Sequence, residues 1–234
     1  MDRAASVPNP VAGSEPASGV GRLMAGERVE DLRRLAILGF AAAALIRVAL
    51  LPSQGFRPDL DQFVLWAHEL VVTPLGDAYR LGMPYPPVLV YVLAALGALD
   101  PMFRTAVAGT GAAVTIAIKL PATLADLGLA AGVAYGLRDR PRWGLYGALA
   151  MLLTPALWYL SAWWGQFDSV YVLPALVAYL LAVSGRPVPG AAALALSVMA
   201  KPQALPLLVP FVAWSLGRLG WRGTVAAGAA SSRR

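Results

Sequence analysis

The sequence predicts an all-α protein: a polytopic transmembrane bundle of about eight helices, with an amphipathic interfacial helix in the first outer loop. Two observations support this fold class. Of the 234 residues, 58% are hydrophobic and only 14% are charged, whereas soluble domains carry about 25% charged residues. The hydrophobic residues also gather into apolar segments separated by short polar ones, a pattern typical of helices that cross a bilayer.

The apolar segments divide the chain into a membrane core, residues 35–217, and two tails. Residues 1–34 lack an apolar period, so we expect a disordered cytoplasmic tail rather than a cleavable signal peptide. Residues 218–234 predict a second flexible tail. The expected spans are 35–51, 86–99, 103–118, 121–137, 143–160, 168–184, 188–200 and 203–217. Around Pro121 two interpretations stay open: a boundary between two spans, or a kink inside one long helix.

Composition also excludes several kinds of site. The chain has no cysteine, which rules out disulfides and thiolate metal sites. A single histidine, His68, cannot form a His-based metal cluster, and few carboxylates converge. We therefore expect no metal and no cofactor.

The distribution of basic residues predicts an orientation. With the N-terminus in the cytoplasm and eight spans, 14 of the 19 basic residues fall on the cytoplasmic side: Arg3, Arg22, Arg28, Arg33, Arg34, Arg104, Arg138, Arg140, Arg142, Arg186, Arg218, Arg222, Arg233 and Arg234. The opposite side holds only Arg57, Arg80, Lys119 and Lys201, and Arg47 lies inside the first span near its outer end. This is the bias of the positive-inside rule. The net charge of +6 therefore indicates a multi-pass protein of the cell membrane, and we expect the lipid bilayer, not nucleic acid, as its partner.

The same topology gathers polar residues on the outer face. They are Asp59, Asp61, Lys119, the turn 163–168 and the segment 201–203, with Asp126 one or two turns below the surface. Polar groups on one face, opposite a face rich in arginine, are the layout of an active site that opens outward.

The first outer loop carries the two carboxylates. Phe63, Trp66 and Leu70 follow helical spacing, which predicts a short helix lying in the membrane interface. Asp59 would then lie just before this helix or in its first turn, where the helix dipole stabilises a carboxylate. The alternative is that Asp59 or Asp61 is only an N-cap residue.

Aromatic and proline motifs near the loop have two interpretations each. Tyr85-Pro86-Pro87 imposes an extended backbone before the next helix and is also common punctuation at a helix start. Trp158, Trp163 and Trp164 suit an aromatic belt at the outer interface. Aromatic rings also stack on sugar faces, so the belt and a binding role are compatible.

Charges within spanning segments cost about 2.5–3.5 kcal/mol each on insertion scales. Lys119 and Lys201 can extend their ammonium groups toward the interface. The shorter Asp126 side chain needs a partner inside the protein. Lys119, Lys201 and Arg47 are the candidates, and the sequence does not choose among them.

Five motifs occur in a recognisable order: Asp59 with Trp66 seven residues later, Tyr85-Pro86-Pro87, Lys119-Leu120-Pro121 with Asp126, Gly165-Gln166-Phe167-Asp168, and Ala200-Lys201-Pro202-Gln203. Together they resemble the integral-membrane glycosyltransferases of the GT-C fold over residues 40–215. The likeness is strongest to the second mannosyltransferase of the GPI-anchor pathway and its bacterial relatives.

The resemblance implies a function. It is the inverting transfer of a hexose, with mannose expected, from a polyprenyl-phosphate donor to a glycan or lipid acceptor on the non-cytoplasmic face. Asp59 matches the general base of the family, and Asp61 is a second acidic residue of the catalytic loop. The substrate-binding residues expected are Arg47, Trp66, Tyr85, Lys119, Asp126, Trp164, Gln166, Asp168, Lys201 and Gln203. Among these, Arg47, Lys119 and Lys201 are suited to hold the donor phosphate.

GT-C enzymes usually run to about twice this length, so we expect a truncated chain carrying the N-terminal part of the fold. Two alternatives follow. The chain is a non-catalytic fragment, or it is a lipid-glycan transporter or flippase. In the second case Lys119, Asp126 and Lys201 would line a pathway, and Pro121 and Pro202 would mark broken helices.

Overall fold

The computed structural model describes residues 19–99, 101–104 and 111–231. These residues form helices and no β-strand, which confirms the all-α class. The elements are α1 (Gly19–Leu50), α2 (Arg57–Glu69), η1 (Leu75–Leu81), α3 (Pro87–Leu99), η2 (Pro101–Arg104), α4 (Ala112–Gly136), α5 (Pro141–Leu153), α6 (Pro155–Trp158), η3 (Tyr159–Trp164), α7 (Asp168–Val183), α8 (Pro187–Ala200), η4 (Pro202–Leu207) and α9 (Leu208–Ser231).

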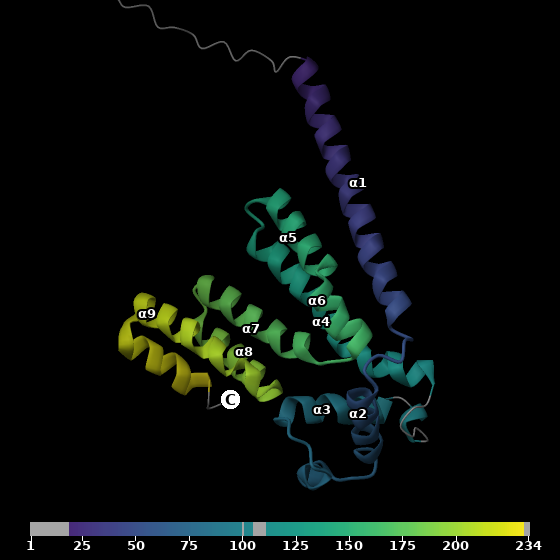
Figure 1. Ribbon diagram of the computed structural model, residues 1–234. Helices are drawn as coiled ribbons and strands as arrows, with labels where there is room; N and C mark the ends of the chain where they lie inside the picture. Colours follow the sequence, from purple (N-terminus) through teal and green to yellow (C-terminus); the bar gives the residue numbers. More distant parts are fainter. Residues whose placement is uncertain (1–18, 100, 105–110, 232–234) are drawn as a thin grey trace, which may run out of the picture.

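The long helices pack side by side in the order α1, α5, α4, α7, α8 and α9 (Figure 1). α4 packs against α5 and α7, α8 packs against α7 and α9, and α1 packs against α5. α2, η1 and α3 gather at one end of this bundle, which we call the α2 end (Figure 1). The short turns 137–140 and 184–186 lie at the opposite end. Helix ends that lie far apart in the sequence therefore meet at the α2 end.

Small residues set the contact between α4 and α7. Gly128, Gly132 and Gly136 repeat at every fourth position of α4, so they share one helix face. A Cβ atom on Gly132 would lie 2.7 Å from Cδ2 of Leu176 on α7. The glycine face therefore lets leucines of α7 reach the surface of α4, which is how small residues bring helices together inside a membrane.

Two helical segments are long and apolar enough to cross a membrane: Ala112–Gly136 and Pro202–Ala226. The bent pair Pro141–Leu153 and Pro155–Trp164, with 46° between its halves, makes a third if it counts as one span. α3, α7 and α8 are apolar but shorter. The structure thus supports insertion into a membrane, and the eight predicted spans are not confirmed.

The predicted spans 103–118 and 121–137 differ from the structure. α4 begins at Ala112 and continues through Pro121 to Gly136 as one helix. Proline inside a helix removes one hydrogen bond, a loss that apolar spanning helices tolerate when neighbouring helices pack around them. The second interpretation of this region, one long helix, is the one that forms.

Both predicted tails also differ from the structure. Residues 19–34 belong to α1, where Glu30 lies 3.4 Å from Arg34 at helical spacing. Because extending an existing helix costs much less free energy than starting one, the polar first half of α1 can form as an extension of its apolar second half. Residues 218–231 continue α9 beyond a break at Gly220 (φ 68°, ψ 174°). Residues 1–18 and 232–234 lie outside the described residues.

α3 lies at the α2 end (Figure 1), where it packs against α2 and also contacts α8 and α4. The contact is so close that a Cβ atom on Gly97 would lie 2.3 Å from the Ala67 carbonyl oxygen. η2 follows α3, and its Phe103 carbonyl accepts a hydrogen bond from the Nδ1–H of His68 on α2 at 2.6 Å. η2 therefore stays at the α2 end, and so does Arg104, which the sequence placed on the cytoplasmic side.

We expect Gly97→Ala to destabilise the protein by about 1–3 kcal/mol, the usual cost of overpacking. The new methyl group would meet a backbone carbonyl, which cannot rotate away. Thermal unfolding in detergent measures the loss. Gly217→Ala is the control, because no heavy atom lies within 4 Å of its Cβ position. Equal melting temperatures for the two variants would contradict the close contact.

Candidate functional site

α2 places Asp59 in its first turn. The helix begins at Arg57 with Phe56 as N-cap residue, and no side chain caps it. Pro58 in the first turn has the backbone angle that a helix start needs. Of the two positions predicted for Asp59, just before the helix or in its first turn, the structure has the second, and the N-cap alternative is wrong for both Asp59 and Asp61.

Asp59 binds two side chains from a distant part of the chain. The indole Nε1–H of Trp164 donates a hydrogen bond to Oδ2 of Asp59 at 2.8 Å. The side-chain amide of Gln166 donates to the same oxygen. Within the described part of the chain, Oδ1 of this half-buried carboxylate accepts no hydrogen bond. One oxygen is therefore held in place while the other remains available to a ligand.

Two glycines allow the turn that carries Trp164 to approach α2. Gly165 ends the π-helix η3 in the left-handed region, at φ 92°. A Cβ atom there would lie 2.3 Å from Cδ2 of Leu60. Gly55 also has positive φ, and its Cβ would lie 2.1 Å from the Trp163 carbonyl oxygen. At each position the backbone has a positive φ and a Cβ atom would clash with a neighbour, so only glycine fits.

A second carboxylate lies at the same end. Asp168 opens α7, and its Oδ1 lies 2.6 Å from Nζ of Lys201, which directly follows α8. Lys201 is 8% exposed, and its ammonium lies 5.9 Å from the centre of the Tyr171 ring. The ion pair thus joins the start of α7 to the end of α8.

Tyr85 lies near both carboxylates. Burial raises the pKa of its hydroxyl, and the charges of Asp59 and Asp168 raise that pKa further. The hydroxyl therefore stays protonated at neutral pH and can donate a hydrogen bond. Asp59, Tyr85 and Asp168 form one cluster with the partners of the two carboxylates. We call this cluster the outer site, after the side of the membrane that the sequence predicts for it.

Trp66 packs against the Tyr85 side chain of the outer site. Its ring is 7% exposed and meets the Tyr85 ring edge-on, with centroids 6.0 Å apart. Its Nε1–H donates to the Leu81 carbonyl at 3.2 Å, which anchors η1. The predicted substrate-binding role of Trp66 stays a prediction, and its contacts are those of a core residue.

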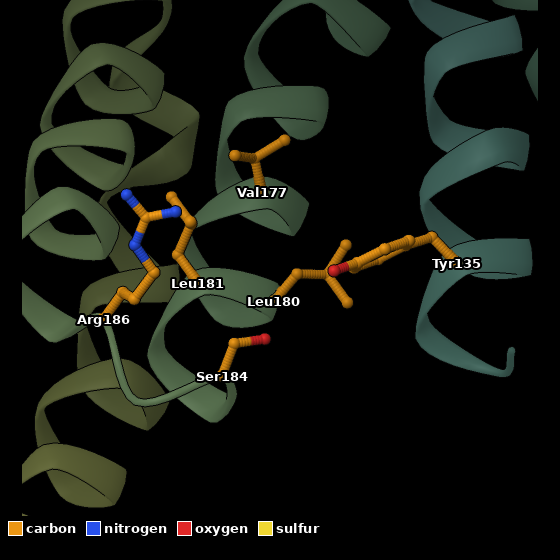
Figure 2. A pocket seen from close by; sticks show the side chains of 6 residues that line it. All are labelled: Tyr135, Val177, Leu180, Leu181, Ser184 and Arg186. Atoms are coloured by element: carbon orange, nitrogen blue, oxygen red, sulfur yellow. The ribbon is translucent and has the colours of Figure 1, made fainter. Parts of the chain in front are cut away.

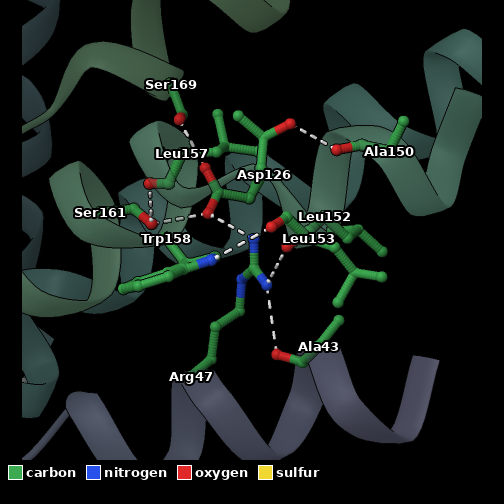
Figure 3. Close-up of polar contacts among 11 residues, drawn as sticks. Ala43, Arg47, Asp126, Ala150, Leu152, Leu153, Leu157, Trp158, Ser161 and Ser169 are labelled. Carbon is green, nitrogen blue, oxygen red and sulfur yellow. Dashed lines mark hydrogen bonds and ion pairs between the residues drawn. The ribbon is translucent and has the colours of Figure 1, made fainter. Parts of the chain in front are cut away.

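Asp126 lies inside the bundle and not at the outer site (Figure 3). Its side chain is 0% exposed. Nη2 of Arg47 lies 3.0 Å from Oδ2, and the hydroxyls of Ser161 and Ser169 donate at 2.6 and 2.5 Å. Arg47 also donates to the Leu152 carbonyl at 2.9 Å. Of the three partners left open by the sequence, the structure selects Arg47.

Lys119 ends up at the terminus of α1. Its fully buried ammonium donates to the Ser53 carbonyl at 2.8 Å, to the Ser53 hydroxyl at 3.2 Å and to the Leu50 carbonyl at 3.4 Å. These contacts match the three protons of an ammonium. They also fix the chain just after the end of α1, where the Leu50 carbonyl accepts hydrogen bonds from the backbone N–H and the hydroxyl of Ser53.

The two remaining predicted residues lie at the α2 end with separate surroundings. Oδ1 of Asp61 lies 2.9 Å from Nη2 of Arg57, one helical turn earlier. Gln203 is exposed in η4, two residues after Lys201. Among the described residues, no three acidic or histidine side chains come together to hold a metal ion.

The two serines that bind Asp126 are functional neighbours that the sequence alone did not predict. Ser161 and Ser169 are 1% and 5% exposed. Small hydroxyl residues within apolar segments hydrogen-bond to neighbouring helices. An unpaired Asp126 in such a segment was the signal to search for them.

Comparisons of the chain with protein families, with curated proteins and with solved structures found no match. The geometry of the outer site therefore carries the functional argument.

Arg47→Met should destabilise the protein by about 3–5 kcal/mol, because it leaves the Asp126 charge buried without its partner. Arg47→Met combined with Asp126→Leu should be clearly more stable than Arg47→Met alone, since no buried charge remains. Thermal unfolding of both variants in detergent measures the difference. If the double variant is no more stable than Arg47→Met alone, the ion pair does not hold the helices together.

Proposed function

We propose that the outer site catalyses inverting transfer of a hexose, with mannose expected, from a polyprenyl-phosphate donor to a glycan or lipid acceptor. Asp59 is the general base. The observation that carries the proposal is the asymmetry of its carboxylate: Trp164 and Gln166 both bind Oδ2. A base held by one oxygen keeps a fixed direction toward an incoming hydroxyl.

The chemistry needs one base and one good leaving group. The acceptor oxygen attacks the anomeric carbon while its proton passes to Oδ1 of Asp59. The bond between the anomeric carbon and the phosphate oxygen breaks, and its electron pair leaves with the lipid phosphate. Attack opposite the leaving group inverts the anomeric configuration. A second acid is not required, because the phosphate accepts the charge.

Lys201 is the proposed cation for the donor phosphate. Arg47 and Lys119, the other two candidates, are committed to buried contacts with Asp126 and with the end of α1. Lys201 lies at the outer site, where Asp168 holds its ammonium in place. A phosphate beside this ammonium would share it with Asp168, and the Tyr85 hydroxyl is a further donor for the bound sugar or phosphate.

We propose six membrane crossings in place of the eight expected, with a cytoplasmic N-terminus. The crossings are α1, α4, α5 with α6 and η3, α7, α8, and η4 with α9. α3 does not cross the membrane in this topology, and α4 is one crossing where the sequence predicted two. The number of crossings therefore falls by two, and because this change is even, the α2 end stays on the non-cytoplasmic side. Arg138, Arg140, Arg142 and Arg186 lie in or beside the turns at the opposite end, as the positive-inside rule requires.

The transport alternative has less support. It needs Asp126 in an aqueous path, whereas this carboxylate is 0% exposed and bound by Arg47, Ser161 and Ser169. The non-catalytic alternative is separated from the proposal by whether the purified chain binds and uses a donor.

Asp59→Asn should lower sugar transfer by about 10²–10⁴-fold, because an amide cannot take the proton of the acceptor. The assay follows labelled mannose from polyprenyl-phosphate mannose into acceptor lipids in proteoliposomes. Asp77→Asn is the matched control: this partly exposed η1 residue forms an ion pair with Arg80, at 3.2 Å. Full transfer by the Asp59 variant overturns the assignment of the base. A wild-type chain that neither binds nor uses the donor favours the non-catalytic fragment.

Lys201→Gln should raise the KM for the donor by roughly ten- to a hundredfold, the range for losing a charged hydrogen bond. The kcat should change less, since the base remains in place. Lys201→Arg should restore part of the donor affinity because it keeps the cation. Unchanged KM in Lys201→Gln would exclude a contact with the donor phosphate.

A further inference from the structure

A cavity of about 280 Å³ opens at the end of the bundle opposite the outer site. It lies between the last turns of α4 and α7 and the turn that leads to α8 (Figure 2). Its lining residues are Tyr135, Val177, Leu180, Leu181, Ser184 and Arg186. The proposed function makes no use of this cavity.

The cavity combines one apolar wall with three polar side chains. Leu180 points toward the Tyr135 ring, and the guanidinium of Arg186 lies beside Leu181 (Figure 2). Tyr135 and Ser184 each add a hydroxyl that can donate a hydrogen bond. Among the described residues, no carboxylate forms an ion pair with Arg186. The cavity thus offers a cation without an ion-pair partner beside an apolar surface.

The surroundings add positive charge. The guanidinium of Arg138 lies over the Tyr135 ring, 4.6 Å from its centre. The turn from α4 to α5 and the first turn of α5 carry Arg138, Arg140 and Arg142 against one carboxylate, Asp139. An anion in the cavity therefore meets an attractive field.

We propose that this cavity binds the headgroup phosphate of an anionic phospholipid. Arg186 and Ser184 bind the phosphate, and an acyl chain follows Val177 and Leu180 along α7. A lipid fits better than a soluble anion for two reasons. The cavity lies at the end of α4, a candidate span, and its wall toward α7 is apolar. Basic pockets between spanning helices are suited to such headgroups.

The test uses the full chain, which contains no cysteine. Val183→Cys introduces one labelling site beside the cavity, at a residue that is 71% exposed and does not line it. The cysteine carries an environment-sensitive fluorophore, and the protein is placed in phosphatidylcholine nanodiscs with rising fractions of phosphatidylglycerol. The measured quantity is the fraction of phosphatidylglycerol at half-maximal change.

Phosphatidylglycerol should change the fluorescence with saturation, and Arg186→Gln should raise the half-maximal fraction about fivefold, the effect of one basic residue near a lipid surface. The control Arg218→Gln, an exposed arginine of α9 outside the cavity, should leave it unchanged. Because Arg186 is exposed, its loss should leave the melting temperature unaltered.

Three results would overturn the proposal. The first is an equal response to both lipids in the wild-type chain. The second is an equal loss in the Arg186 and Arg218 variants, which would indicate only general surface charge. The third is competition by glycerol 1-phosphate at the same phosphate concentration, which would indicate a site for a soluble anion. None of these results bears on sugar transfer at the outer site.

Discussion

The arrangement of the helices depends on the hydrogen bonds and the ion pair of the buried Asp126 carboxylate. This carboxylate lies on α4 and accepts hydrogen bonds from Arg47 of α1, Ser161 of η3 and Ser169 of α7. A buried charge without partners costs several kcal/mol, so the position of each donor is constrained by the need to satisfy it. Apolar packing between helices inside a membrane is weakly directional, and this polar centre supplies the direction that packing lacks.

The π-helix η3 connects this centre to the outer site. Ser161 faces Asp126, and Trp164, three residues later, binds Asp59. A π-helix places side chains differently from an α-helix and often occurs at functional sites. Gly165 then reverses the chain so that Gln166 reaches the same oxygen of Asp59. The direction of the proposed base is thus set by a segment whose other face is anchored in the bundle.

The sequence predicted the members of the outer site better than their roles. The predicted topology placed Asp59, the turn 163–168 and Lys201 on the same side of the membrane. In the structure they also lie at one end of the bundle, although two of the predicted spans are a single helix. The same reasoning grouped Lys119 with these residues, although its ammonium is used at the end of α1. Arg47 was a candidate for phosphate and is instead the partner of Asp126. Topology gives the end of a helix at which a side chain lies, not the face on which it points.

The sequence by itself determined the helical class, the apolar character and the place of Asp59 beside the start of α2, because these depend on composition and on local spacing. It also contained the Gly128, Gly132 and Gly136 repeat, whose partner leucines lie about 45 residues away along the chain, a separation that only folding brings to contact distance. The tertiary structure decided which charges pair with each other and which remain at the surface. The reason is physical: several cations were equally acceptable partners for Asp126, and only the packing of α1 against its neighbours brings one of them within hydrogen-bond distance.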